Sequence, residues 1–303
     1  MQLHNPQIKR TLLVNIARNM FCSIPGTIKI RRLILGSPFG PSSSYTESSW
    51  HERRGAQIRK ILNAYLKVWG DIDWFQNKVV VELGSGNDIS LPFCFALLGA
   101  SKAYATDVPL IDDIALSDAL RDKVKSVIAE LGPHKFLIQP NIAEKLVIRK
   151  SHLWAENLVN AFSPESIDFI VSTSTLEHVP DPVLAASQMF RALRYGGRMI
   201  HAIALGNHCC GGGEKDRLAH LCYSDRVWNL RFSRRVGHNR LRWFEWKSIL
   251  TEAGFDIAGH DLTIVPSADI ALNRPHLAAR FARMSDEQLG PSYAVVSLSK
   301  NNR

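Results

Sequence analysis

The chain has 303 residues, 46% of them apolar, and a formal net charge of +9. This length and apolar content can supply a full hydrophobic core, in one large domain or two modest ones. No apolar run approaches the roughly 18 residues that span a bilayer, so we expect no membrane-spanning segment. The five cysteines lack the spacing of a disulfide framework, which indicates a reducing compartment.

The positive charge is concentrated in two segments. Residues 1–60 contain ten Lys or Arg and two acids, and residues 214–242 contain eight Lys or Arg and three acids. Basic segments attract phosphates, anionic lipids or nucleic acid, and charge alone does not choose among these partners.

The N-terminal part of the chain is predicted to be a helical cap over residues 1–75. Apolar residues recur at helical spacing over 8–20 and again over 52–69, and a Gly-, Pro- and Ser-rich loop lies at 36–44. Three interpretations of the first helix stay open: a cap packed on the core, which we favour, an interfacial helix that brings residues 1–35 to an anionic membrane, and an Arg-rich transit peptide.

Residues 79–87 read Val-Val-Val-Glu-Leu-Gly-Ser-Gly-Asn and are the most informative stretch of the sequence. Three consecutive β-branched residues predict a strand that is buried on both faces. Gly84 and Gly86 permit a sharp turn and a close approach of a ligand to the backbone. A helix is predicted over 89–98, and its N-terminus favours negatively charged ligand groups.

This turn differs from a dinucleotide-binding loop in two ways. Its sixth position is the large, branched Ile89, where that loop needs Gly or Ala. Glu82 precedes the first glycine by two residues, where an acid suits a sulfonium ligand with a free amino group better than a pyrophosphate. Asp107 lies in the next predicted strand, 103–108, and follows Gly86 by 21 residues, close to the spacing expected of an acid that accepts both ribose hydroxyls.

The rest of the chain alternates between predicted helices and strands, as in a parallel α/β sheet. In chain order the predicted elements are a helix over 112–131, strands over 136–139 and 167–171, a helix over 182–194, a strand over 198–205, a helix over 244–253 and strands over 255–264 and 293–298. Residues 206–243 interrupt this alternation. Their arginines and aromatic residues predict a lid over the substrate, with a solvated basic surface helix as the alternative.

The Glu-x-Gly-x-Gly turn, Asp107 and the segment 166–182, which contains Leu-Glu-His-Val-Pro-Asp-Pro, resemble motifs of the class I S-adenosylmethionine-dependent methyltransferases, type 11 family. The resemblance covers residues 50–300. It implies an α/β fold with a doubly wound, Rossmann-like seven-stranded sheet, helices on both faces, and an antiparallel last strand between the fifth and sixth. It also implies a methyltransferase domain over residues 76–303, with the lid inserted in it and helix 52–69 covering the cofactor.

The resemblance implies S-adenosylmethionine as the cofactor. Contacts are expected from the glycine-rich turn, from the end of the second strand, from the segment after the third strand and from the end of the fourth strand. These predicted cofactor-binding residues are Glu82, Gly84, Ser85, Gly86, Asn87, Asp107, Val108, Asn141, Ile142, Ser172 and Thr173.

Methyl transfer from a sulfonium needs alignment and desolvation, and an oxygen or nitrogen acceptor must also lose a proton. His178 is the predicted base, because the loop after the fourth strand lies beside the methyl group in this fold; the alternative is a histidine that only holds its turn. The predicted acceptor contacts are Ser174, His220, Tyr223, Trp228 and Arg235.

No metal is predicted. Some relatives have a metal-binding Glu-x-x-Glu-His cluster, and its first position here is Ser174. The residues His208, Cys209, Cys210, His220 and Cys222 suit zinc by type but not by spacing.

We expect methyl transfer to an oxygen of a small-molecule or lipid- or sugar-linked acceptor, and the lid arginines favour an anionic one. A nucleic-acid (RNA) methyltransferase is the alternative, favoured by the basic segments but opposed by the lack of an Asn/Asp-Pro-Pro-Tyr/Phe tetrapeptide after the fourth strand and of a recognisable RNA-binding module. A silent binding protein that keeps the fold is the third possibility. The expected location is cytoplasmic, with peripheral membrane contact left open.

Overall fold

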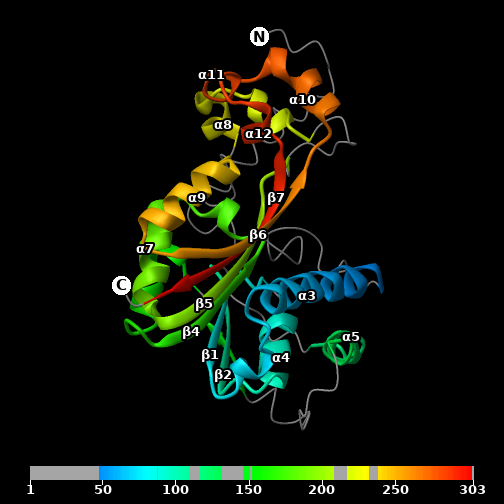
Figure 1. Cartoon of the computed structure of the whole chain (residues 1–303), viewed down its shortest axis with the longest axis vertical. Helices are drawn as coiled ribbons and strands as arrows, with labels where there is room; N and C mark the ends of the chain where they lie inside the picture. Colours follow the sequence, from blue (N-terminus) through cyan, green and yellow to red (C-terminus); the bar gives the residue numbers. More distant parts are fainter. Residues whose placement is uncertain are drawn as a thin grey trace.

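The computed structural model describes residues 48–86, 88–108, 116–131, 146–150, 152–207, 217–231 and 238–301. Its centre is a seven-stranded sheet in the order β3-β2-β1-β4-β5-β7-β6 (Figure 1). The strands are β1 (Val79–Leu83), β2 (Lys102–Thr106), β3 (Val147–Lys150), β4 (Ile167–Thr173), β5 (Leu193–Ala204), β6 (Asp256–Ile264) and β7 (Pro291–Lys300). Strands β1 to β5 pair in parallel, and β7 runs antiparallel to both β5 and β6. The predicted fold class is therefore confirmed.

Helices cover both faces of the sheet (Figure 1). One face carries α3 (Ser48–Trp69), α4 (Ser90–Leu97) and α5 (Asp118–Ala129), and the other carries η3 (Ala155–Asn160), α7 (Pro182–Ala192) and α9 (Trp243–Glu252). Neighbouring strand residues serve opposite cores: Val80 packs with the first group of helices and Val81 with the second. This alternation explains why four of the five residues of β1, all except Glu82, are apolar, since both faces of the strand are covered.

Helix α3 is held on the sheet by an aromatic cluster. Tyr65 packs on Phe75 of η2 (Ile72–Phe75) and on Phe169 of β4, with ring centroids 4.6 and 5.8 Å apart. Apolar residues at 58, 61, 62 and 65 point into the core, as predicted from their spacing. The first turns of α3 consequently lie against the carboxyl ends of the central strands.

Two predicted boundaries in the first half of the sheet are wrong. The strand that pairs with β2 is Val147–Lys150, eleven residues after the predicted 136–139, which lies outside the described residues. Helix α5 begins at Asp118 rather than 112, because the extended Ser117 caps it and accepts a hydrogen bond from the Leu120 N–H at 3.3 Å. Asn141 and Ile142 therefore precede the third strand instead of following it.

A small helical layer stands beyond the ends of β6 and β7 (Figure 1). It combines η6 (Ala219–Cys222) and α8 (Asp225–Arg231) of the predicted lid with α10 (Ser267–Asn273), η7 (Arg274–His276), α11 (Ala279–Ala282) and α12 (Asp286–Leu289). Leu218 and Leu221 share a core with Ile270, Phe281 and Leu289. The insertion between β6 and β7 was not predicted, and it gives the lid segment a partner.

The N-terminal predictions over residues 1–47, including the helix over 8–20 and the loop over 36–44, lie outside the described residues. The domain division at residue 75 stays a prediction. Within the described ranges, each helix is too short or too polar to span a bilayer.

Strand β5 begins at Leu193, five residues before its predicted start, and runs through Gly196 and Gly197.

Candidate active site

The glycine-rich turn after β1 uses its two glycines for different purposes. Gly84 and Gly86 both have positive φ, +73° and +60°. A Cβ on Gly84 would lie 2.2 Å from Thr175 Oγ1, whereas a Cβ on Gly86 would meet none of the described residues within 4 Å. Gly84 therefore permits close packing of two loops, and Gly86 faces open space at the carboxyl edge of the sheet.

Asp107 closes this turn from the end of β2. Its Oδ2 accepts a hydrogen bond from the Gly86 N–H and its Oδ1 one from the Val108 N–H, each at 2.6 Å. Burial raises the pKa of the Asp107 carboxyl, and the two N–H donors oppose that shift. Gly86, Asp107 and Val108, predicted from sequence separately, thus form one hydrogen-bonded group.

Glu82 is buried beside an arginine that sequence reasoning missed. Arg54 of α3 donates from Nη2 to Glu82 Oε1 at 3.0 Å, and its Nε lies 2.9 Å from Asp88 Oδ2. Burial raises the pKa of Glu82, and Arg54 opposes that shift. A signal was available, because Arg54 lies four residues before Ile58 on the apolar face of its helix, where a cation needs a buried partner.

The three polar residues at the end of β4 point to different places. Ser172 is fully buried, and its Oγ lies 2.8 Å from Nδ1 of His201. Burial lowers the pKa of His201 to about 3, which keeps that ring neutral. Thr173 Oγ1 accepts from Arg54 Nη1 at 3.1 Å, and Ser174 is exposed with φ +52°.

The turn η4 (Leu176–His178) follows β4 and carries two proton-accepting groups. Glu177 is fully buried and has no ion pair with a described residue, and the only groups that oppose the effect of burial on its pKa are the backbone N–H groups of Glu177 and Ala204. Burial raises the pKa of Glu177 to about 8. His178 is half-buried, with its ring centroid 6.2 Å from that of His238. The Asn239 N–H donates to the Glu177 carbonyl at 2.7 Å, which fixes the turn.

The described residues of the predicted lid are mostly interior. His220, Tyr223 and Trp228 are buried, and Trp228 Nε1 donates to the His238 carbonyl at 2.8 Å. Arg240 pairs with Asp225 and donates to the Tyr223 carbonyl at 2.6 Å, while Arg242 binds three backbone carbonyls. Through these hydrogen bonds to backbone carbonyls, Arg240 and Arg242 connect segments that are distant in the sequence. Arg235, Asn87, Asn141 and Ile142 lie outside the described residues.

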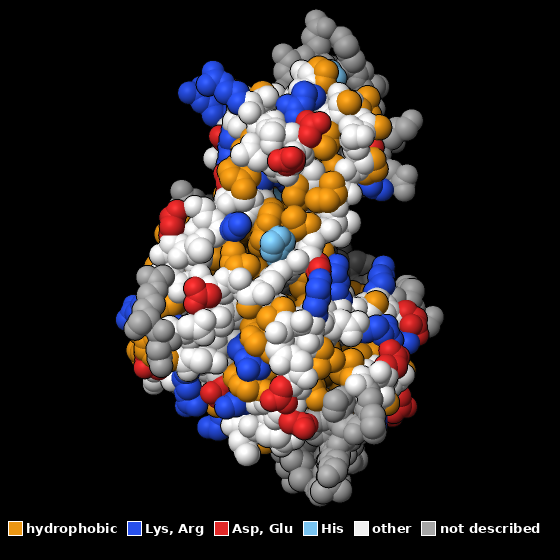
Figure 2. All heavy atoms as spheres, viewed as in Figure 1, with side chains coloured by type: hydrophobic (Ala, Val, Ile, Leu, Met, Phe, Trp, Pro, Cys, Tyr) orange, Lys and Arg blue, Asp and Glu red, His pale blue; other side chains and the backbone are white. Residues whose placement is uncertain are grey.

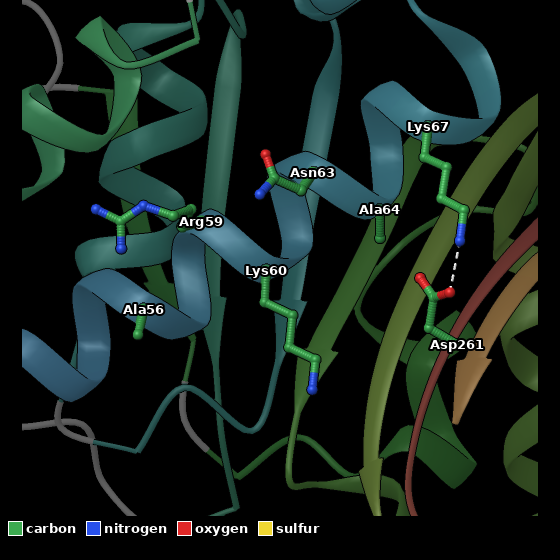
Figure 3. Close-up of a pocket in the computed structure, with 7 residues that line it drawn as sticks. All are labelled: Ala56, Arg59, Lys60, Asn63, Ala64, Lys67 and Asp261. Carbon is green, nitrogen blue, oxygen red and sulfur yellow. Dashed lines mark hydrogen bonds and ion pairs between the residues drawn. The ribbon is translucent and has the colours of Figure 1, made fainter. Parts of the chain in front are cut away.

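A shallow groove of about 310 Å³ runs along the outer side of α3. It is lined by Ala56, Arg59, Lys60, Asn63, Ala64, Lys67 and Asp261 (Figure 3). Arg59 pairs with Glu130 and Lys67 with Asp261, whereas Lys60 Nζ lies 4.0 Å above the ring of Tyr293. Basic side chains accordingly gather over α3 on the molecular surface (Figure 2).

Comparison with known proteins identifies the family. A family model described as a methyltransferase domain matches residues 49–259. No curated protein matches the chain. Similar solved structures include an S-adenosylmethionine-dependent methyltransferase from Mesorhizobium loti, with 18% identity over 76% of this chain and 96% of that one and a TM-score of 0.39.

Two further solved structures are similar to this chain. One is a putative sarcosine dimethylglycine methyltransferase from Galdieria sulphuraria, with 14% identity over 83% of this chain and 85% of that one and a TM-score of 0.46. The other is phosphoethanolamine N-methyltransferase 2 from Haemonchus contortus in complex with S-adenosylmethionine, with 14% identity over 82% and 53% and a TM-score of 0.45. The family model covers more than half of the chain, from α3 into β6. The chain belongs to this methyltransferase family and is an S-adenosylmethionine-dependent methyltransferase of class I.

Proposed function

We propose that the carboxyl edge formed by β1, β2 and β4 holds S-adenosylmethionine. The residues fit such a ligand: the space beside Gly86 is open, and Asp107 places a carboxylate at the edge where two ribose hydroxyls would be bound. Glu82, Gly84, Ser85 and Gly86 would surround the amino-acid tail. When bound, the cofactor supplies a methyl group already activated on a sulfonium.

We assign the contact with the adenine ring of the donor to the segment after β3. Residues 152 and 153 donate N–H groups to the carbonyls of Val108 and Asp107 at 3.2 and 3.0 Å, which brings them beside the proposed ribose site. Asn141 and Ile142 were predicted for this role on the assumption of an earlier third strand. With β3 ending at Lys150, His152 and Leu153 are the better candidates.

The reaction proposed is methyl transfer to an oxygen of a small-molecule or lipid- or sugar-linked acceptor. The turn after β4 is the proposed place of proton removal, with His178 as the base, because His178 retains exposed surface and Glu177 has none. An anionic acceptor finds support in the groove along α3, where Lys60 has no acidic partner within 4 Å among the described residues (Figure 3). Arg240 and Arg242 do not support it, since both are buried.

Nucleic acid is not proposed as the acceptor. Arg240 and Arg242 belong to the second basic segment, and their burial removes two charges that would otherwise contact phosphates. The roles of Ser174, His220, Tyr223, Trp228 and Arg235 toward an acceptor, the membrane contact of residues 1–35 and the cytoplasmic location stay predictions.

The donor site is tested by titration calorimetry with S-adenosylmethionine and with S-adenosylhomocysteine. Asp107→Ala should weaken binding of both by about 100-fold, the loss expected of a hydrogen-bonded charged group. Asp122→Ala, on the exposed side of α5, is the matched control. Equal affinities for wild type and Asp107→Ala would remove Asp107 from the site.

The acceptor and the base are tested together. Labelled methyl transfer from S-adenosylmethionine into neutral and phosphorylated small-molecule fractions of a cell extract identifies the acceptor by its mass gain. His178→Ala should slow this transfer about 100-fold or more while donor affinity stays near normal. Normal transfer by His178→Ala excludes it as the base, and equal use of neutral and phosphorylated acceptors excludes the anionic preference.

A further inference from the structure

Asn239 contacts both ends of the η4 turn, which carries the proposed base. Its side-chain Nδ2 donates to the carbonyls of Leu176 and Val179 at 2.9 and 3.4 Å. Its backbone N–H donates to the Glu177 carbonyl at 2.7 Å. The orientation of the amide is fixed, because its Oδ1 accepts from the backbone N–H two residues later at 3.2 Å. One residue therefore binds carbonyls on both sides of His178.

The segment around Asn239 is itself held from two directions. His238 Nε2 lies 2.9 Å from the Ala204 carbonyl at the end of β5, and His238 Nδ1 accepts from the Arg240 N–H at 2.9 Å. Because a carbonyl only accepts, Nε2 carries the proton and donates it. Trp228 Nε1 of α8 donates to the His238 carbonyl at 2.8 Å. This segment thus connects the helical layer to the end of β5.

The ring of His178 also packs on this segment. Its centroid lies 6.2 Å from that of His238, and the two ring planes cross at 84°. Contacts from residues 238 and 239 therefore place both the backbone of the turn and the ring of the proposed base. A base must lie within hydrogen-bond reach of the proton that it removes, and a displacement of about 1 Å can cost about 100-fold in rate.

We infer that Asn239 is a positioning residue for the proposed base, because it fixes the η4 turn at the place where the His178 ring meets the acceptor. The inference rests on the proposed function, since it requires His178 to remove the proton. Asn239 acts through His178 and touches neither donor nor acceptor. The end of the predicted lid segment thereby takes part in catalysis through the backbone of the turn after β4.

The test is a double-mutant cycle on the full chain, measured as labelled methyl transfer from saturating S-adenosylmethionine into the small-molecule fraction of a cell extract. Asn239→Ala should slow transfer about 10–100-fold, because two carbonyls of the turn lose their donor and the turn can shift. In the His178→Ala background the same substitution should change the rate by less than about 2-fold, because no base is left to misplace. Calorimetry should give Asn239→Ala an affinity for S-adenosylhomocysteine within about 2-fold of that of wild type.

Asn273→Ala is the matched control. Asn273 Nδ2 also donates to a backbone carbonyl, that of Asp269 at 2.8 Å, and this bond lies within α10. The control variant should lose a similar side-chain hydrogen bond and still transfer methyl groups at the wild-type rate. A purely structural role of Asn239 predicts instead that Asn239→Ala and Asn273→Ala behave alike.

Transfer by Asn239→Ala at the wild-type rate, or an additive loss in the double variant, overturns the inference. Each rate is divided by the fraction of protein that binds S-adenosylhomocysteine, so that partial unfolding does not imitate a loss of catalysis. Should Asn239→Ala not fold, Asn239→Asp takes its place in the same cycle, because it keeps the side-chain volume and the acceptor for the Leu241 N–H. Normal transfer by His178→Ala would instead overturn the proposed base, and failure of wild type to bind S-adenosylhomocysteine would overturn the proposed donor site.

Discussion

Glu82 and Glu177 lie at the carboxyl ends of neighbouring strands, and both are buried, at 1% and 0% exposure. Glu82 has a guanidinium 3.0 Å away, whereas Glu177 has no cationic partner among the described residues and only backbone N–H groups act on its carboxylate. Burial raises the pKa of both carboxyls; at Glu82 Arg54 opposes this, and at Glu177 the pKa reaches about 8. The two acids differ chiefly because a helix 28 residues away along the chain supplies a cation to one of them.

Removing the cation gives the largest expected effect on stability. Arg54→Ala leaves Glu82 and Asp88 buried without their partner, which should cost about 3–5 kcal/mol of unfolding free energy. Arg59→Ala breaks the exposed pair with Glu130 on the same helix and should cost less than about 1 kcal/mol. Chemical denaturation of both variants measures the difference. Similar losses would show that burial does not distinguish the two pairs.

Glu177→Gln tests the unpaired acid. The folded pKa of Glu177, about 8, lies above the ordinary 4.5, so the folded state binds more protons at this carboxyl between these values and the contribution of Glu177 to stability should fall as pH rises from about 4.5 to 8. Buried His201, with a pKa of about 3, contributes in the opposite direction up to about pH 6.5, so the Glu177 contribution is measured as the stability of wild type minus that of Glu177→Gln. The loss should be about 3 kcal/mol, below the limit of roughly 5 that the full shift allows. This difference should decrease as pH rises from about 4.5 to 8, whereas the difference between wild type and His178→Gln should not show this decrease. A difference between wild type and Glu177→Gln that is flat between pH 4.5 and 8 contradicts the assignment.

Tyr293 gives a second comparison of the two acids, because Glu177 and the Arg54 partner of Glu82 both affect its pKa. Burial and, to a smaller extent, the charge of Glu177 raise the pKa of Tyr293 to about 12, and the charge of Arg54 opposes this rise. Glu177→Gln should therefore lower the pKa of the phenol, and Arg54→Gln should raise it, as followed by ultraviolet titration. Shifts of equal sign in the two variants would mean that Tyr293 does not lie between the two groups.

Replacing each glycine of the turn after β1 by alanine should give the smallest changes in stability. The two variants distinguish a glycine needed for packing from one that leaves space for the ligand. Gly84→Ala combines positive φ with a contact of 2.2 Å to Thr175 and should destabilise the fold by about 2–3 kcal/mol. Gly86→Ala meets no neighbour in the described part of the chain, so it should cost only about 1 kcal/mol and mainly weaken donor binding. Thermal unfolding with and without S-adenosylhomocysteine distinguishes these outcomes. Normal donor binding by Gly86→Ala would place the ligand elsewhere.

The local sequence pattern was sufficient to predict the glycine-rich turn and its acid, because short segments of the chain determine both the structure and the chemistry there. The run Val79–Val81, the two glycines and the spacing to Asp107 predicted a buried strand, a turn and an acid that the structure joins by a 2.6 Å hydrogen bond. The parallel sheet makes this possible, since consecutive strands end at the same edge. The antiparallel last strand was predicted by the family resemblance alone, and the structure confirms it.

Sequence pattern did not predict the long-range packing of the lid segment, whose role toward an acceptor stays a prediction. Tyr223 and Trp228 have the composition of a ligand-binding lid, yet both side chains are buried in the helical layer. The lid segment packs on the insertion between β6 and β7, and the spacing of apolar residues in the sequence did not predict that insertion. Short helices such as α11 and α12 carry too few residues for a detectable repeat and are stabilised by their shared core.

The amino-acid order alone determined the class of sheet, the position of the turn after β1 and the acid at the end of β2, because each depends on neighbouring residues and a fixed strand–helix spacing. Tertiary structure decided the charge state of the site. Glu82 has the Arg54 guanidinium beside it because of where α3 crosses the sheet. The aromatic packing of Tyr65 on Phe75 and Phe169 sets that crossing, and the sequence around Glu82 or Glu177 does not.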